Sequence, residues 1–366
     1  MLKSAIVGLF LTVHLVVGKR YVVSHAPGTT GVSSFHRKLH SFTSIGASVY
    51  ELNATEVAAL HKDSTVKVYE DLPVSITALV QKSPPAWGLD RIDQNSLPLD
   101  NRYLYPKVAG KGANVFIIDT GVHVNHVEFT KRAVFAKNFV GDSIDDDCNG
   151  HGTHVASIVG GTNVGVAKQT KIYAIKVLGC DGSGSFSNVM AGIQYVIDYQ
   201  KTAVNKRTII NMSLGGGFYK PVNDMVEAAV AAGITVVVAA GNENADACNT
   251  SPASAPSAIT VAASEITDNR ASYSNFGSCV DIYAPGSNIY AAFGSGSSNT
   301  TYATLSGTSM ASPHVAGTAA LYLGSKVALT PVAVHDRLLT DASDGKIKGN
   351  VGVTVNKLLF LKNNFT

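Results

Sequence analysis

From about residue 110 onward, short apolar runs alternate with longer amphipathic stretches, and this is the pattern of repeated βα units. The runs 113–118 and 234–240 are apolar enough to be strands buried on both faces. Further strands are predicted at 171–177 and 207–212, and helices at 152–161, 186–200 and 222–232. The alternation predicts an α/β fold with a mostly parallel sheet and helices on both faces. Functional side chains gather at the carboxyl ends of the strands in such a sheet.

Residues 19–79 have a different pattern, typical of a small α+β unit. Strands are predicted at 20–23, 47–52 and 66–70, and helices near 33–41 and after Asn53. A segment containing Pro73, Pro84 and Pro85 separates this unit from Trp87. About 60 residues fold alone only marginally, so we expect this unit to depend on the larger domain.

Residues 1–18 begin with a positive charge at Lys3 and continue with an apolar stretch over 5–17. This is the pattern of a secretory signal peptide. An uncleaved membrane anchor is the alternative, but about 13 apolar residues are few for a span of about 20. No later stretch is apolar enough to cross a bilayer, so we predict a secreted chain without a membrane anchor once the signal is removed.

Composition and charge exclude some classes of protein. The chain has 366 residues, of which 45% are hydrophobic and 15% charged, and this favours a large core over disorder. Residues 80–366 carry 22 Lys and Arg against 21 Asp and Glu. This near-neutral balance offers no electrostatic case for nucleic-acid binding.

The four cysteines are Cys148, Cys180, Cys248 and Cys279. An even number in a secreted chain predicts two disulfides, and three pairings are possible. Free buried thiols are the alternative. A metal site made of all four thiolates is disfavoured because the sequence has no C-x-x-C pair.

Three residues at predicted strand ends or helix starts could form a nucleophilic centre. Asp119 ends a buried strand, His151 opens a helix, and Ser309 is expected just ahead of another helix, with Pro313 in its first turn. Serine needs a base to take its proton, and a buried carboxylate orients and charges a histidine for that task. Asn242, after the most apolar strand, could donate a hydrogen bond to a developing oxyanion. Taken alone, the serine is more often a capping residue, the aspartate a turn or cap residue and the histidine structural, but together they indicate catalysis.

The segments that carry these residues resemble a known family. They are DTG at 119–121, HGTH at 151–154, AGN at 240–242 and GTSMASPH at 307–314. This motif set is similar to that of the subtilisin-like serine proteases. The segments WGL at 87–89, GSG at 182–184 and NMSLG at 211–215 resemble the proteinase K branch of that family. The resemblance runs from about residue 80 to about residue 325, and it implies a subtilisin-like three-layer fold and a monomer.

The resemblance also assigns roles to the residues. It implies that Asp119 orients His151, that His151 acts as general base and then acid, and that Ser309 is the nucleophile. Asn242 and the backbone N–H of Ser309 would form the oxyanion hole. In subtilisin itself, loss of such a donor lowers turnover by about 10²–10³.

The family binds a polypeptide substrate as an added strand. By resemblance, the segments that flank the peptide are Gly182, Ser183, Gly184, Ser213, Leu214 and Gly215. Ala239, Ala240 and Gly241 match a wall of the pocket before the scissile bond, and Phe186 matches an aromatic position further along the cleft. These matches imply broad cleavage after apolar or aromatic residues. Ordinary turns are the alternative explanation of the glycine-rich pieces.

Residues 19–79 resemble the family's inhibitory prosegment, which assists folding and then blocks the cleft. The resemblance therefore divides the chain into a signal peptide (1–18), a prosegment (19–79) and a peptidase domain (80–366). We expect the enzyme to cut itself between Leu79 and Val80, because an apolar residue at 79 suits an apolar cleft.

The resemblance implies structural Ca²⁺ and a disulfide pattern. Asp281 with the carbonyls of Pro256 and Ala258 matches one family site, and Asp90, Asp93, Gln94 and Asp100 match a second site in aqualysin-like members. A further ligand position of the second site falls on Arg102, whose side chain cannot coordinate a cation. Capping and turn carboxylates are the alternative for both groups. The same aqualysin-like pattern favours the pairs Cys148–Cys180 and Cys248–Cys279. The acidic run 145–147 is expected to be a solvated loop.

Two other functions are compatible with parts of the sequence. The segment 307–311 approaches the G-x-S-x-G motif of α/β-hydrolase esterases, but that fold expects the acid and the histidine after the serine. The second alternative is a catalytically inactive binding or surface protein on the subtilase fold. All four catalytic positions are occupied by suitable residues, which favours the enzyme.

Overall fold

The computed structural model describes residues 19–25, 37–42, 46–71, 78–294, 298–325, 329–349 and 351–362. The chain forms two compact units, Met1–Ser75 and Ile76–Thr366. The expected signal peptide at 1–18 lies outside the described residues. Within the described ranges, no helix combines the length and the apolar character needed to cross a membrane.

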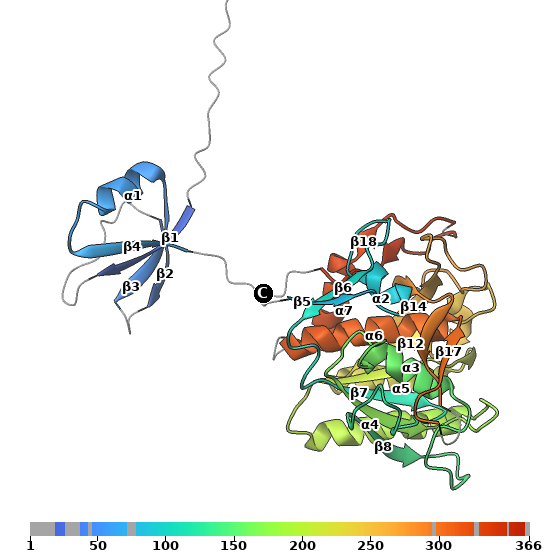
Figure 1. Ribbon diagram of the computed structural model, residues 1–366. Helices are drawn as coiled ribbons and strands as arrows, with labels where there is room; N and C mark the ends of the chain where they lie inside the picture. Colours follow the sequence, from blue (N-terminus) through green and yellow to red (C-terminus); the bar gives the residue numbers. More distant parts are fainter. Residues whose placement is uncertain are drawn as a thin grey trace, which may run out of the picture. The chain divides into compact units, whose positions relative to one another are not determined.

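In its described residues, the first unit is an antiparallel sheet with one helix (Figure 1). Its strands are β1 (Lys19–His25), β2 (Arg37–Phe42), β3 (Ala47–Leu52) and β4 (Val66–Glu70), in the order β2-β3-β1-β4. Helix α1 (Ala54–Leu60) begins after Asn53, whose side chain accepts hydrogen bonds from the Thr55 and Glu56 backbone N–H groups. Glu56 bonds back to the Asn53 N–H and completes a capping box.

The helix expected near 33–41 is wrong where the structure describes it, because residues 37–42 are a strand. β2 pairs with β3, from Arg37 opposite Glu51 to Phe42 opposite Ala47. All six β2 side chains are exposed. The backbone bonds to β3 therefore decide the conformation of β2, and a partner of this kind leaves no signal in the local sequence.

The second unit contains a larger sheet with the strand order β18-β19-β15-β14-β12-β10-β7-β9-β8. The neighbouring pairs are parallel except β18 with β19. The strands are β7 (Asn114–Asp119), β8 (Ala133–Asn138), β9 (Lys171–Lys176), β10 (Thr208–Met212), β12 (Thr235–Ala239), β14 (Ile259–Ser264), β15 (Ile282–Pro285), β18 (Ser343–Asp344) and β19 (Lys357–Leu358). The predicted parallel sheet is confirmed.

The second unit also contains helices and pairs of short strands. The helices are α2 (Trp87–Ile92), α3 (His151–Gly160), α4 (Phe186–Thr202), α5 (Lys220–Ala231), α6 (Thr308–Ser325), α7 (Pro331–Asp341) and the short 3₁₀ turn η2 (Ala247–Asn249). Three two-stranded pairs join β5 (Ala78–Lys82) to β6 (Arg102–Pro106), β11 (Gly216–Gly217) to β13 (Thr250–Ser251), and β16 (Ile289–Ala292) to β17 (Tyr302–Leu305).

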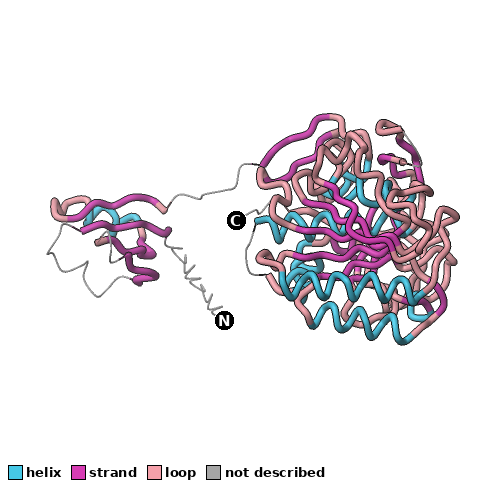
Figure 2. The backbone as a smooth tube through the Cα atoms, turned by 90° about the horizontal axis from the view of Figure 1, so that it is seen from below, coloured by secondary structure: helices cyan, strands magenta, loops and turns pink. Residues whose placement is uncertain are grey.

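The sheet is covered by helices on both faces (Figure 2). Successive residues of β7 point to opposite faces, so Val115 and Ile117 join one apolar cluster and Phe116 and Ile118 join another. The first cluster includes apolar residues of α3, α6 and α7, and the second those of α4 and α5. This burial on both sides explains why β7 is apolar at each of its central positions.

Helix α6 begins at Thr308, five residues before Pro313, so the expectation that Pro313 lies in the first turn is wrong. Pro313 has no N–H to donate to the Ser309 carbonyl. The Ser213 hydroxyl donates to that carbonyl at 2.9 Å instead. A side chain from after β10 therefore satisfies the helix at its proline and fixes the first turn, which contains Ser309.

Leu79 and Val80 lie in β5, opposite Tyr105 and Leu104 of β6. Both side chains are exposed. The division between the compact units falls a few residues earlier, between Ser75 and Ile76, and residues 72–77 lie outside the described ranges. The cleavage expected between Leu79 and Val80 stays a prediction.

The cysteines form two disulfides, Cys148–Cys180 and Cys248–Cys279. Of the three possible pairings, this is the one that the family resemblance implies. The first disulfide joins the segment before α3 to the segment after β9. Two loops at the same edge of the sheet are thereby tied together.

Candidate active site

Asp119 and His151 meet at the carboxyl edge of the sheet. Asp119 is the last residue of β7 and is fully buried, while His151 is the first residue of α3. The Nδ1 atom of His151 lies 2.7 Å from Oδ1 of Asp119. This contact fixes the Nδ1–H tautomer and leaves Nε2 as the acceptor.

Opposing effects act on the pKa of His151. Burial lowers the pKa, but the charge of Asp119, its hydrogen bond and the charge of Asp147 together raise it above 6.5. The histidine is therefore a stronger base than a free imidazole. Its ring is partly accessible, with 27% of the side chain exposed. These are the properties required of a general base.

Close backbone contact between the turn after β7 and the start of α3 brings Asp119 and His151 together. A Cβ atom on Gly152 would lie 2.0 Å from the Gly121 carbonyl oxygen, so the turn after β7 touches the first turn of α3. Gly150, the residue before the helix, has φ +106°, and a Cβ there would overlap the Phe293 ring. Both positions thus require glycine.

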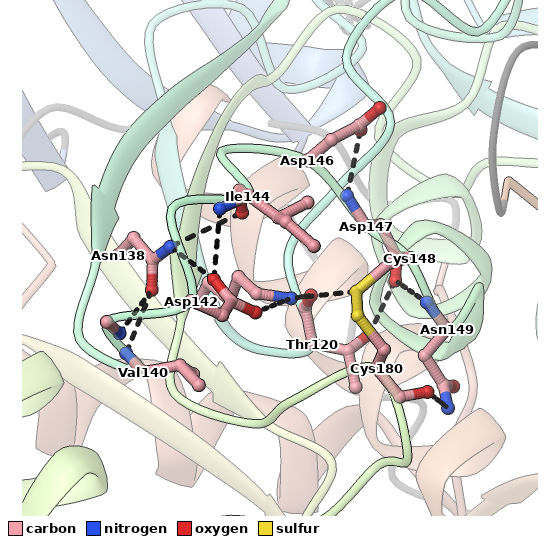
Figure 3. Close-up of polar contacts among 12 residues, drawn as sticks. Thr120, Asn138, Val140, Asp142, Ile144, Asp146, Asp147, Cys148, Asn149 and Cys180 are labelled. Atoms are coloured by element: carbon pink, nitrogen blue, oxygen red, sulfur yellow. Dashed lines mark hydrogen bonds and ion pairs between the residues drawn. A yellow bond between two sulfur atoms is a disulfide. The ribbon is translucent and has the colours of Figure 1, made fainter.

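Asp147 links the same two segments, and the expectation that 145–147 is a solvated loop is wrong for this residue. Its carboxylate is fully buried. It accepts hydrogen bonds from Thr120 Oγ1 and the Asn149 N–H (Figure 3). The Gly150 N–H and both N–H and Oγ1 of Thr153 also donate to it. Four of these five donors lie within six residues after Asp147, and Thr120 completes the set from the turn after β7, so the burial depends on the packing of these two segments.

Ser309 and Asn242 approach this pair from other elements. The Ser309 hydroxyl donates to the Ser213 carbonyl at 3.2 Å, and none of the described hydrogen bonds joins it to His151. Asn242 Oδ1 accepts from both N–H and Oγ1 of Thr308, at 2.8 and 3.0 Å. Because Oδ1 is engaged, the amide Nδ2 remains available as the donor.

Two adjoining cavities, of about 480 and 530 Å³, extend from these residues. The first is lined by Leu214, Gly215, Gly216, Gly217, Ala239, Ala240, Gly241, Asn242, Glu243, Thr250, Ser251, Ala253, Thr308 and Ser309. The second is lined by Thr120, Asn149, His151, Leu178, Gly182, Ser183, Gly184, Ser185, Phe186, Val189, Ser213, Leu214, Gly215 and Gly216. The cavities share three lining residues, so they form one elongated cleft with Ser309 in one part and His151 in the other.

All ten residues expected to contact a substrate line this cleft. Several other lining residues escaped the sequence analysis. Gly216 and Gly217 continue the glycine run after Gly215, and Glu243 follows Asn242 directly, so adjacency could have found them. Thr250 and Ser251 had no such signal, because the pairing of β13 with β11 brings them to the cleft.

Three carboxylates and one amide, from Asp90, Asp93, Asp100 and Gln94, form a group suited to a cation. Asp93 Oδ1 is buried without a hydrogen-bond partner in the described structure, while its Oδ2 accepts from the Leu104 N–H. Burial, with the charges of Asp90 and Asp100, raises the pKa of Asp93 to about 7. A bound Ca²⁺ would use the free oxygen and neutralise the repulsion, so these residues fit the ion.

The second candidate group fits a cation less well. Asp281 Oδ2 accepts from the Thr260 N–H at 2.8 Å, and Oδ1 lies 3.6 Å from His335 Nε2. The hydrogen bonds of His335 and the charge of Asp281 raise the pKa of His335, whereas burial lowers it. The imidazole therefore competes for the carboxylate that would join the carbonyls of Pro256 and Ala258. Another close group, Asp142 with Cys148 and Cys180, offers no thiolate because its sulfurs form a disulfide.

Comparisons with protein families, with known sequences and with solved structures agree with one another. Residues 110–356 match the subtilase family. An alkaline serine exoprotease A of Vibrio alginolyticus is 44% identical over 323 residues, which cover 87% of this chain and 59% of that protein. An extracellular serine proteinase of a Thermus species is 45% identical over 315 residues, covering 85% of this chain and 74% of that protein.

A fungal relative and a solved structure agree with these matches. Subtilisin-like protease 7 of Arthroderma otae is 48% identical over 265 residues, which are 72% of this chain and 65% of that protein. The crystal structure of a cold adapted subtilisin-like serine proteinase superposes with a TM-score of 0.70 at 48% identity. The match covers 75% of this chain and 97% of that structure. The chain thus spans less than two thirds of the Vibrio and Arthroderma proteins and nearly all of the solved one.

Proposed function

The chain belongs to the subtilase family, and on this premise we propose that it is a secreted serine endopeptidase that works through an acyl-enzyme. The observation that carries the proposal is the buried Asp119 carboxylate 2.7 Å from His151, in a cleft that Ser309 also lines. A peptide placed along this cleft would have nucleophile, base and oxyanion donor beside one carbonyl group.

In the proposed mechanism, the Ser309 hydroxyl turns from the Ser213 carbonyl toward His151 and attacks the scissile carbonyl carbon. His151 Nε2 takes the hydroxyl proton and later gives it to the leaving amine. Asp119 holds the ring and stabilises the imidazolium. Asn242 Nδ2 and the Ser309 N–H donate to the oxyanion. A water molecule, activated by His151, then hydrolyses the acyl-enzyme.

The cleft supports a preference for apolar or aromatic residues before the scissile bond. Alanines, glycines and Leu214 contribute much of the first cavity's lining, beside polar residues such as Glu243 and Thr250, and Phe186 and Val189 line the second. The glycines at 182, 184 and 215 expose backbone groups that can pair with an extended peptide. The proposed substrates are therefore polypeptides in extended conformation, cut by a monomer without a nucleic-acid partner.

We also propose that the chain is made as a zymogen and holds Ca²⁺. Residues 19–79 would fold as the inhibitory prosegment, and cleavage after Leu79 would release the mature domain. The acidic group around Asp93 would hold the ion, and the ion would supply positive charge that stabilises the 90–100 segment. Extracellular release fits the name of the Thermus relative.

The test is intact mass and N-terminal sequence of secreted wild type beside Ser309→Ala. Wild type should start at Val80 and react with a serine-directed fluorophosphonate. The Ser309→Ala protein should remain joined to residues 19–79 and stay unlabelled. Wild type that is neither labelled nor able to cut an apolar peptide would favour the inactive subtilase-fold protein instead.

If both proteins mature alike but only wild type is labelled, another protease removes the prosegment. The endopeptidase proposal would stand in that case, and the self-cleavage proposal would be wrong.

A further inference from the structure

Asn275 occupies a loop between β14 and β15 and is fully buried. Nothing in the proposed mechanism uses it. Its side chain nevertheless makes four hydrogen bonds, all to the turn 240–245, which carries Asn242. This concentration of contacts on one turn of the active site requires an explanation.

The contacts use the full capacity of the amide. Asn275 Oδ1 accepts from the Glu243 N–H at 3.0 Å and the Ala245 N–H at 2.9 Å. Its Nδ2 donates to the Ala240 carbonyl at 2.9 Å and to Glu243 Oε2 at 2.7 Å. The Asn275 backbone N–H donates to the Gly241 carbonyl at 3.0 Å. Residues on both sides of Asn242 are thus bonded to one side chain.

The turn needs such support because, among the described residues of the second unit, its outer side is exposed. Residues 242–246 are exposed, and Gly241 has φ +105°. A Cβ on Gly241 would lie 2.3 Å from Asn275 Nδ2, so the two segments are in direct contact. Exposed turns of this kind move more than the strands they follow unless buried groups hold them.

Two anchors therefore act on Asn242. Thr308, beside Ser309 on α6, holds the side-chain oxygen of Asn242. Asn275 holds the backbone on either side of it. An amide fixed at both its oxygen and its backbone presents Nδ2 in one direction, and preorganised donors stabilise an oxyanion far better than mobile ones.

We infer that Asn275 is a positioning residue for the oxyanion hole: it holds the 240–245 turn so that Asn242 Nδ2 faces the developing oxyanion beside Ser309. The inference rests on the proposed endopeptidase function. It differs from a purely structural role in one respect. Loss of Asn275 must lower turnover through Asn242 and must have no separate effect once the Asn242 amide is gone.

The test is a double-mutant cycle with Asn275→Ala and Asn242→Ala, using a peptide p-nitroanilide that ends in Phe. Asn242→Ala should lower kcat by about 10²–10³. Asn275→Ala should lower kcat by about 10–100-fold with KM changed by less than about threefold, because a small displacement of a donor affects the transition state more than binding. The double variant should match Asn242→Ala within about threefold.

Two further variants keep the test decisive. Asn275→Asp keeps the acceptor for the Glu243 and Ala245 N–H groups, and it replaces Asn275→Ala in the cycle if the alanine protein fails to fold. Asn223→Ala removes another buried amide, on helix α5, which donates a hydrogen bond to the Ser254 hydroxyl. This variant should leave kcat unchanged.

If the two single losses of kcat multiply in the double variant, or if folded Asn275→Ala keeps the wild-type kcat, the inference is wrong. The proposed function is left intact in both cases. Wild type that does not hydrolyse the peptide would reject the proposed function, and the inference with it.

Discussion

At the scale of single residues, the site depends on how burial and charge are balanced at His151. Burial alone would make the imidazole a weaker base, because a charged ring is poorly solvated in the interior. Asp119 and Asp147 outweigh that effect and raise the pKa of His151. For His154, the next histidine of α3, burial first and then the charge of the neighbouring His151 lower the pKa to about 4. Two histidines on one helix thus differ because of their surroundings.

Asp119→Asn should lower kcat by about 10⁴, because the amide no longer holds the Nδ1–H tautomer. The base must be neutral to act, so kcat/KM of wild type should rise with pH through the raised pKa of His151, above 6.5. Removal of the Asp119 charge should move this acid limb to lower pH. The pH profile of kcat/KM measures both effects.

Asp341→Asn is the matched control for that variant, because Asp341 is a buried carboxylate bonded to Tyr322 of α6 and to Arg337 of its own helix, α7. It should leave the profile in place. An acid limb that stays at the wild-type pH in Asp119→Asn would contradict the role given to Asp119.

At the scale of elements, the site forms because strands of one parallel sheet end at one edge. β7 brings Asp119, the segment after β10 brings Ser213, and the segment after β12 brings Asn242. Two helices start at the same edge and bring His151 and Ser309. Their close approach depends on glycines, most of all on Gly152 against the Gly121 carbonyl.

Gly152→Ala should destabilise the protein by about 3 kcal/mol, because the new Cβ would meet a backbone oxygen that cannot move aside. An alanine in a helix would otherwise stabilise by up to about 1 kcal/mol. Urea unfolding of an inactive Ser309→Ala background measures the change without self-digestion. Gly217→Ala, where a Cβ has open space, should leave the midpoint unchanged. Equal midpoints for both variants would show that the two turns can separate.

At the scale of the whole molecule, stability depends on charges that the fold places together. Asp93 is buried beside Asp90 and Asp100, and its folded pKa of about 7 lies above the unfolded value of 3.8. The folded state therefore holds this proton more tightly, and the free energy of unfolding falls as pH rises from 3.8 through about 7. A bound cation would offset that loss.

Calcium should raise the Tm of wild type at pH 8, and chelation should lower it. Asp93→Asn should have a higher Tm than wild type in the absence of calcium, because the repulsion is removed, and should gain little when calcium is added. Differential scanning calorimetry of the inactive background gives these values. If Asp281→Asn rather than Asp93→Asn abolishes the rise of Tm with calcium, the ion binds at the group around Asp281. Equal Tm values with and without calcium would reject both sites.

The sequence by itself determined the parallel α/β sheet, because a strand buried on both faces must be apolar throughout and its helices must be amphipathic. It also determined which residues could act, since Asp119, His151, Asn242 and Ser309 stand beside turn and helix-start signals. Only the tertiary structure decided the strand at 37–42, the start of α6 before Pro313, the burial of Asp147 and the hydrogen bonds of Asn275 to the 240–245 turn. It also selected one disulfide pairing of three, as the resemblance had implied. The strand, the helix start, the disulfides and the Asn275 contacts each depend on a partner distant in the chain, and Asp147 depends in part on Thr120. A hydrogen bond or a contact with a distant partner leaves no periodicity in the local sequence.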